Sequence, residues 1–167
     1  MAAVRGRGPR SFAVCVAVGL AVVIAPTAFA AKAPTRAEYV ARLEQICRPG
    51  SDATQRVVRG VRADVRAERL RLAGTKFAKA KRIFVRTVST IATVPRPGPD
   101  STTLARWFAA LAREEVLLGR TADALRAEDV ARFQRVSADF IHEGNKANNV
   151  VVSFGFNYCD FKPSRFQ

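Results

Sequence analysis

Apolar residues recur every three to four positions along most of the chain from residue 35 onward, which is the spacing of one face of an α-helix. The first such stretch opens with a capping box, Thr35-Arg36-Ala37-Glu38, whose hydroxyl and carboxylate can each accept a hydrogen bond from an amide at the helix start. The apolar side chains that follow on one face are Tyr39, Val40, Leu43, Ile46 and Cys47. Cys47 is therefore predicted to point inward, and Pro49-Gly50 predicts a kink in this helix.

Residues 51–94 have the length of one long helix, but their apolar positions indicate two. In the first part these positions are Val57, Val58, Val61, Val65 and Leu72. In the second part they are Phe77, Ala80, Phe84, Val88 and Ile91. At about 100° per residue, the second stripe is rotated by roughly 120° from the first, well beyond the ~20° per heptad of ordinary drift. A turn is therefore predicted between Arg66 and Thr75, with Gly74 available for it.

Two more breaks divide the rest of the chain. Residues 94–100 (VPRPGPD) predict the end of a helix, because proline lacks the amide hydrogen that a helix uses. Ser101 is predicted to open the next helix, residues 125–129 to form a tight turn, and Gly155 to cap the last helix. The inward residues expected here are Leu104, Trp107, Phe108, Leu111, Leu118, Leu125, Val130, Phe133, Val136, Phe140, Ala147, Val151 and Phe154. The pattern predicts an all-α fold, an up-down four-helix bundle.

Residues 1–30 have the features of a secretory signal peptide. A short basic segment precedes the apolar run from Phe12 to Ala25, and Pro26 ends that run. Ala28-Phe29-Ala30 then offers small residues at the positions that signal peptidase reads. We expect cleavage after Ala30, which leaves residues 31–167 as one helical domain outside the cytoplasm. The alternative is a retained membrane anchor, because residues 11–31 are just long enough to cross a bilayer.

Removal of residues 1–30 would leave two cysteines, Cys47 and Cys159, in an oxidising compartment. We expect them to form a disulfide that joins the first helix to the C-terminal end of the bundle. On the chain-entropy model, closing a loop of this length stabilises a fold by up to about 4–5 kcal/mol. The alternative is a pair of free, buried thiols.

The rest of the chain is strongly basic, since 25 Lys/Arg against 14 Asp/Glu give residues 31–167 a net charge of +11. Eleven of these basic residues lie between Arg56 and Arg86. Four of them fall within about 80° of one another around a helix and predict an anion-binding face. These four are Arg59, Arg62, Arg66 and Arg69. The alternative is a solvated face without a ligand, and export makes nucleic acid an unexpected partner.

The sequence offers little for catalysis. His142 is the single histidine, and with Asp139 it has the spacing of a di-iron ligand pair, but such sites need a second histidine. Glu114 and Glu115 are adjacent, so their side chains diverge around a helix and cannot act as a carboxylate pair. Three asparagines could line a small polar pocket or cap backbone groups: Asn145, Asn148 and Asn149. We therefore expect a non-enzymatic protein without cofactor or metal.

Several short motifs carry a resemblance. They are AEYVARLEQIC at residues 37–47, the proline-rich break, ADALRAED at residues 122–129 and GFNYC at residues 155–159. These look like the motifs of a loose group of secreted actinobacterial helical proteins that carry a first-helix AIC and a closing YG-x-x-x-C, mostly without an assigned function. The resemblance implies a four-helix bundle closed by an end-to-end disulfide, and it implies no catalytic residues. This chain departs from the group by continuing to Gln167 and by being unusually basic.

The leading hypothesis is an extracytoplasmic binding protein whose basic face contacts anionic polymers or lipid head groups of the cell envelope. One alternative is a structural or accessory secreted protein with no ligand. The other is a small hydrolase or metal-binding bundle, which a pocket gathering His142 with two or more carboxylates would favour.

Overall fold

The computed structural model describes residues 33–161, and every regular element in that range is helical. The long helices are α1 (Arg36–Val58), α3 (Leu70–Ala92), α4 (Ser101–Arg126) and α5 (Val130–Val150). The short elements are α2 (Val61–Arg66) and the 3₁₀ turns η1 (Gly98–Asp100) and η2 (Val152–Phe154). The predicted all-α fold with four main helices is confirmed. The expected signal segment lies outside the described residues.

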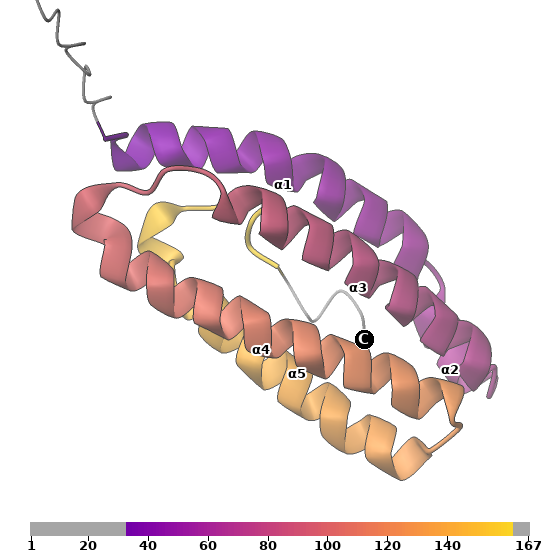
Figure 1. Ribbon diagram of the computed structural model, residues 1–167. Helices are drawn as coiled ribbons and strands as arrows, with labels where there is room; N and C mark the ends of the chain where they lie inside the picture. Colours follow the sequence, from indigo (N-terminus) through magenta and orange to yellow (C-terminus); the bar gives the residue numbers. More distant parts are fainter. Residues whose placement is uncertain (1–32, 162–167) are drawn as a thin grey trace, which may run out of the picture. The chain divides into compact units, whose positions relative to one another are not determined.

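The long helices alternate in direction and pack in chain order, α1 on α3, α3 on α4 and α4 on α5 (Figure 1). The chain that follows α5 turns back into the bundle, between the α1–α3 pair and the α4–α5 pair (Figure 1). There Cys159 is bonded to Cys47 of α1, with the two Cα atoms 5.2 Å apart. The predicted end-to-end disulfide is thus confirmed. Within the described range, no helix combines the length and the apolar character that crossing a membrane requires.

The start of α1 forms as the sequence predicts. The Glu38 amide donates to Thr35 Oγ1 at 3.3 Å, and the Thr35 amide donates to Glu38 Oε2 at 2.7 Å. This capping box supplies partners for two amides at the helix start. Next to it, the Arg36 guanidinium makes a two-point contact with the buried Asp100 carboxylate and ties α1 to the start of α4.

The kink predicted at Pro49-Gly50 is wrong in position. The α1 helix continues through Pro49, which is exposed, and the chain turns at Arg59–Gly60, where Gly60 takes a left-handed φ of 76°. Gly50 instead lies against α3, because a Cβ there would come within 2.3 Å of Thr87 Oγ1. This glycine permits close approach of two helices and does not end one.

The turn predicted between Arg66 and Thr75 is confirmed and lies at residues 67–69, but Gly74 does not form it. Gly74 is buried within α3, where a Cβ would lie 2.9 Å from the carbonyl oxygen of Ala122 in α4. The chain turns two residues after the end of α2, at Glu68, which has a left-handed φ of 57°. The breaks predicted at residues 94–100 and 125–129 are confirmed, and α4 begins at Ser101.

Most of the predicted inward residues are buried. Trp107 is completely buried and stacks on Phe156, with ring centroids 5.3 Å apart. Leu72 and Val130 are exceptions, 46% and 48% exposed. Leu72 follows the turn at residues 67–69, so the phase of the preceding stripe does not extend to it, and Val130 is the first residue of α5.

The C-terminal segment, residues 151–161, is held on α1 by more than the disulfide. The Glu44 carboxylate accepts hydrogen bonds from the amides of Asn157, Tyr158 and Cys159, at 3.0 to 3.2 Å. Gly155 does not cap the last helix as predicted, because α5 ends at Val150. With a φ of 66°, it ends η2 instead and redirects the chain there. These contacts fix the segment across the interior of the bundle.

Candidate functional site

The four arginines predicted to share one helical face lie on separate segments. Arg59 follows α1, Arg62 and Arg66 belong to α2, and Arg69 precedes α3. Left-handed residues in both intervening turns interrupt the continuous helical phase on which the prediction of a common face relied. Anion binding by these side chains stays a prediction.

Arg69 compensates an internal acid. Its Nε and Nη2 donate to Asp64 Oδ1 at 3.0 and 2.6 Å, and Lys76 Nζ donates to Asp64 Oδ2 at 2.6 Å. Lys76 also donates to the Arg59 carbonyl at 2.9 Å. These hydrogen bonds, from Lys76 first and Arg69 second, hold the pKa of the buried Asp64 below its usual range. The cluster joins α2 to α3, and because one carboxylate faces two cations it keeps one net positive charge.

Other basic side chains of this region are exposed and form no ion pair with any residue in the described range. We call the following five the outer basic surface: Arg56, Arg59, Lys79, Arg82 and Arg86. The last three recur at helical spacing on the side of α3 opposite the buried Phe77 and Phe84. The exposed positive charge therefore belongs to the α1–α3 layer and not to a single arginine face.

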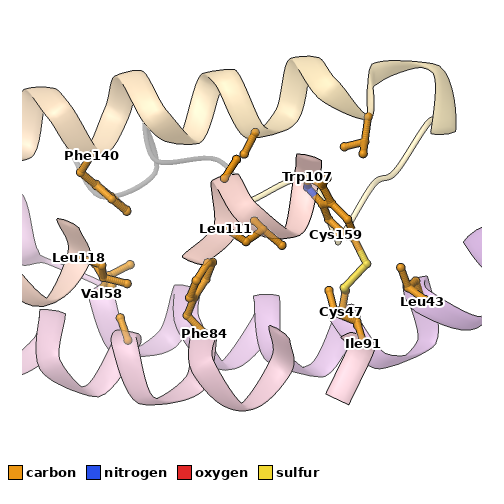
Figure 2. Close-up of a cluster of buried hydrophobic side chains, with 14 of the residues drawn as sticks. Leu43, Cys47, Val58, Phe84, Ile91, Trp107, Leu111, Leu118, Phe140 and Cys159 are labelled. Carbon is orange, nitrogen blue, oxygen red and sulfur yellow. A yellow bond between two sulfur atoms is a disulfide. The ribbon is translucent and has the colours of Figure 1, made fainter. Parts of the chain in front are cut away.

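A central cavity of about 40 Å³ lies inside the bundle, and sequence reasoning did not find it. Its apolar lining includes Phe84 of α3, Leu118 of α4 and Phe140 of α5, which converge on one interior region in Figure 2. Glu114 of α4 and Asp160 of the C-terminal segment also line it. The cavity thus brings two carboxyl groups together with aromatic rings.

Glu114 is the most perturbed ionisable group of the described chain. Its residue is 2% exposed, and its Oε2 has no hydrogen-bond partner. Burial, with smaller contributions from the nearby Glu143 and Asp160, raises the pKa of Glu114 to about 8. Glu143 itself is paired with Arg113, which holds the pKa of Glu143 below its usual range. At neutral pH, Glu114 is therefore a carboxylic acid beside an ionised neighbour.

The pattern of α4 contained a signal for Glu114. The residue lies three positions after Leu111 and four before Leu118, on the same inward stripe. An acid at a core position is unusual enough to mark a candidate site. Because Glu114 was considered only together with the adjacent Glu115, its place on the inward stripe was missed.

His142 does not line the central cavity. It is exposed on α5, in a groove that it shares with Asn145, Lys146 and Asn149. Between residues 33 and 161, no group of three His, Cys, Asp or Glu side chains could hold a metal ion. The pocket of His142 with two or more carboxylates that would have favoured an enzyme is not formed by these residues.

The predicted asparagine pocket is present as an open groove. Asn145, Asn148 and Asn149 line it together with Phe156 and Asp160 of the C-terminal segment. Asn148 Nδ2 also donates to the Phe161 carbonyl at 3.1 Å. One asparagine thus caps a backbone group, as the alternative interpretation expected, while the groove shares Asp160 with the central cavity.

Comparison of the chain with protein-family models, with curated protein sequences and with solved structures gave no significant match.

Proposed function

We propose that this protein is an exported, non-enzymatic binding protein whose outer basic surface holds phosphate-bearing polymers or lipid head groups of the cell envelope. The observation that carries this proposal is the exposed set of cations on α1 and α3 that lack an acidic partner in the described chain. Closely spaced cations attract an anionic surface, each by about 1 kcal/mol near a membrane.

The distribution of acids supports the same proposal. Three acids form ion pairs with arginines inside the fold: Asp64, Asp100 and Glu143. Glu115 and Glu128 compensate Lys81 and Arg71 between helices. These acids thus pair with other basic residues, and the outer face of α3 keeps its positive charge.

The disulfide supports export. Cys47 and Cys159 are both completely buried and bonded, and such bonds form and persist mainly in oxidising compartments. Together with the signal-like residues 1–30, this favours action outside the cytoplasm.

Binding to vesicles and to a soluble polymer tests the proposal. At low salt we expect the protein to bind phosphatidylglycerol vesicles or a polyglycerol-phosphate polymer, and to release them as the salt concentration rises. It should not bind phosphatidylcholine vesicles, which carry no net charge. Comparing the two anionic probes identifies the source of the phosphate. Replacing Lys79, Arg82 and Arg86 with glutamine should weaken binding on the order of 100-fold, from about 1 kcal/mol per charge.

The matched control removes the same charge from another face. Arg120, Arg132 and Arg135 are exposed on α4 and α5, and their triple glutamine variant should bind nearly as tightly as the unaltered protein. Equal losses in both variants, or no binding of either anionic probe at low salt, would refute the proposal.

A further inference from the structure

We propose that the central cavity binds the ammonium end of a small primary amine, with Glu114 as its counter-ion. This site is separate from the outer basic surface and takes a ligand of opposite charge, so it does not depend on the proposed function above.

The first support is the unused hydrogen-bonding capacity of Glu114. Glu114 lines the cavity, and its Oε2 is buried without a hydrogen-bond partner. Burying an oxygen without a hydrogen-bond partner is unfavourable, because the group loses its hydrogen bonds to water. A ligand that donates an N–H group would supply the missing hydrogen bond.

The second support is the combination of groups around the cavity. Phe84, Phe140, Tyr158 and Phe161 line it, and aromatic faces attract cations. Asp160 adds a second carboxyl group, and the nearby Glu143 adds negative potential at Glu114. An ammonium group has three N–H donors, which suits two carboxyl groups better than an anionic or purely apolar ligand would.

The third support is size. A buried water needs roughly 10–15 Å³ of such space, so a cavity of about 40 Å³ accommodates a group on the scale of methylammonium or ethylammonium. A bulky quaternary ammonium ion would not fit. Ser51 and Thr54 of α1 also line the cavity.

Binding should be coupled to a proton. The pKa of Glu114 is raised to about 8, so at pH 7 the acid is mostly protonated. When R–NH₃⁺ enters, the carboxyl group forms an ion pair as the carboxylate and releases its proton to the buffer. Loss of this proton distinguishes a buried ion pair from weak association of a cation with the surface.

Titration calorimetry with methylammonium chloride tests the proposal. The purified full chain is titrated at pH 7 and constant ionic strength, in two buffers that differ in ionisation enthalpy. We expect saturable 1:1 binding with release of close to one proton. Glu114→Gln should weaken binding at least tenfold and abolish proton release. Glu115→Gln makes the same substitution at the neighbouring position, outside the cavity lining, and should leave affinity within twofold.

Two further ligands sharpen the result. Butylammonium distinguishes a small free amine from the amine end of a longer ligand. If butylammonium binds, its alkyl chain can extend out through the mouth of the cavity; if it does not bind, the ligand is restricted to short amines. Methanol, a neutral molecule of similar size, should bind at least tenfold more weakly than methylammonium.

The proposal is overturned if methylammonium gives no saturable binding, if methanol binds equally well, or if tetraethylammonium competes with methylammonium. Should Glu114→Gln fail to fold cooperatively, Ala80→Val provides the second variant, because Ala80 is fully buried and lines the cavity. Its added methyl groups should reduce affinity at least tenfold, and unchanged affinity would place the ligand elsewhere. Neither result depends on binding to anionic vesicles.

Discussion

Glu114 occupies a position where the α4 pattern expects an apolar side chain. Folding must transfer its carboxyl group from water into an apolar interior, and that transfer favours the neutral form. The fold therefore takes up a proton at Glu114 under conditions where the unfolded chain has released it. A core acid with this property makes the stability of the protein depend on pH near neutrality.

We expect the free energy of unfolding to fall as the pH rises from 5 to 8. The pKa of Glu114 is about 8 in the folded protein and 4.5 ordinarily, so in this window the folded state binds the extra proton, and each pH unit costs up to about 1.4 kcal/mol. Above the folded pKa the loss should level off. Urea unfolding at pH 5 and pH 8 measures the difference.

The Glu114→Gln variant is the control for this dependence. Its stability relative to the unaltered protein should rise by about 3 kcal/mol between pH 5 and pH 8. Asp64, Asp100 and Glu143 have lowered pKa values, so the stability that they contribute is lost only at more acidic pH. Parallel pH profiles for the two proteins would contradict the assignment to Glu114.

At the scale of helices, two glycines set how closely the elements approach. Gly50 lets α1 contact Thr87, and Gly74 lets α3 lie against the α4 backbone at Ala122 and Arg126. At both positions a side chain would occupy space that the neighbouring helix already fills.

Gly74→Ala should therefore destabilise the fold by about 1–3 kcal/mol, the usual cost of overpacking. The new Cβ would meet the carbonyl oxygen of Ala122 and the amide nitrogen of Arg126, both at 2.9 Å, and these backbone atoms move only if α4 moves. Thermal and urea unfolding measure the change.

Gly119→Ala is the matched control within α4. Its Cβ would meet only the side chain of Lys81, whose Nζ at 3.2 Å can move aside. Because alanine favours helix by up to about 1 kcal/mol over glycine, this variant should be slightly more stable. If both variants gained stability, the α3–α4 contact would be looser than described.

The same elements show how far sequence reasoning reached. The proline-rich break and the capping box at Thr35 were predicted correctly, because each follows from local chemistry. Gly50 and Gly74 were misread as breaks, since a glycine in a helical stretch has the same local pattern whether the helix ends there or another helix crosses it. The true break at Gly60 separates stretches that both have helical periodicity.

At the scale of the whole molecule, the C-terminal segment completes the central cavity. It supplies Tyr158, Asp160 and Phe161 to the lining of the central cavity. The disulfide partners could be predicted from cysteine count and compartment. Glu44 could not, because nothing near it in the sequence indicates that its carboxylate accepts amides more than a hundred residues away.

Glu44→Gln should loosen this segment without unfolding the bundle. Hydrogen bonds to a charged acceptor contribute about 1.5–3 kcal/mol, so we expect a loss of about 2 kcal/mol of local stability. Hydrogen exchange should show faster exchange at the amides of Tyr158 and Cys159 and little change in α3 and α4. Glu38 lies on the same helix, within the capping box. Glu38→Gln should leave the amides of Tyr158 and Cys159 protected from exchange.

The position of the disulfide also decides how the molecule responds to force. The bond joins two points that are 112 residues apart in the chain, so a pull on the segments before Cys47 and after Cys159 passes directly through the two sulfur atoms. The helices α2 to α5 lie within the closed loop and would carry no tension. Within the described chain, only the part of α1 that precedes Cys47 and the residues after Cys159 could be pulled away. The helices α2 to α5 would stay folded under load, while the cavity would lose Asp160 and Phe161 from its lining.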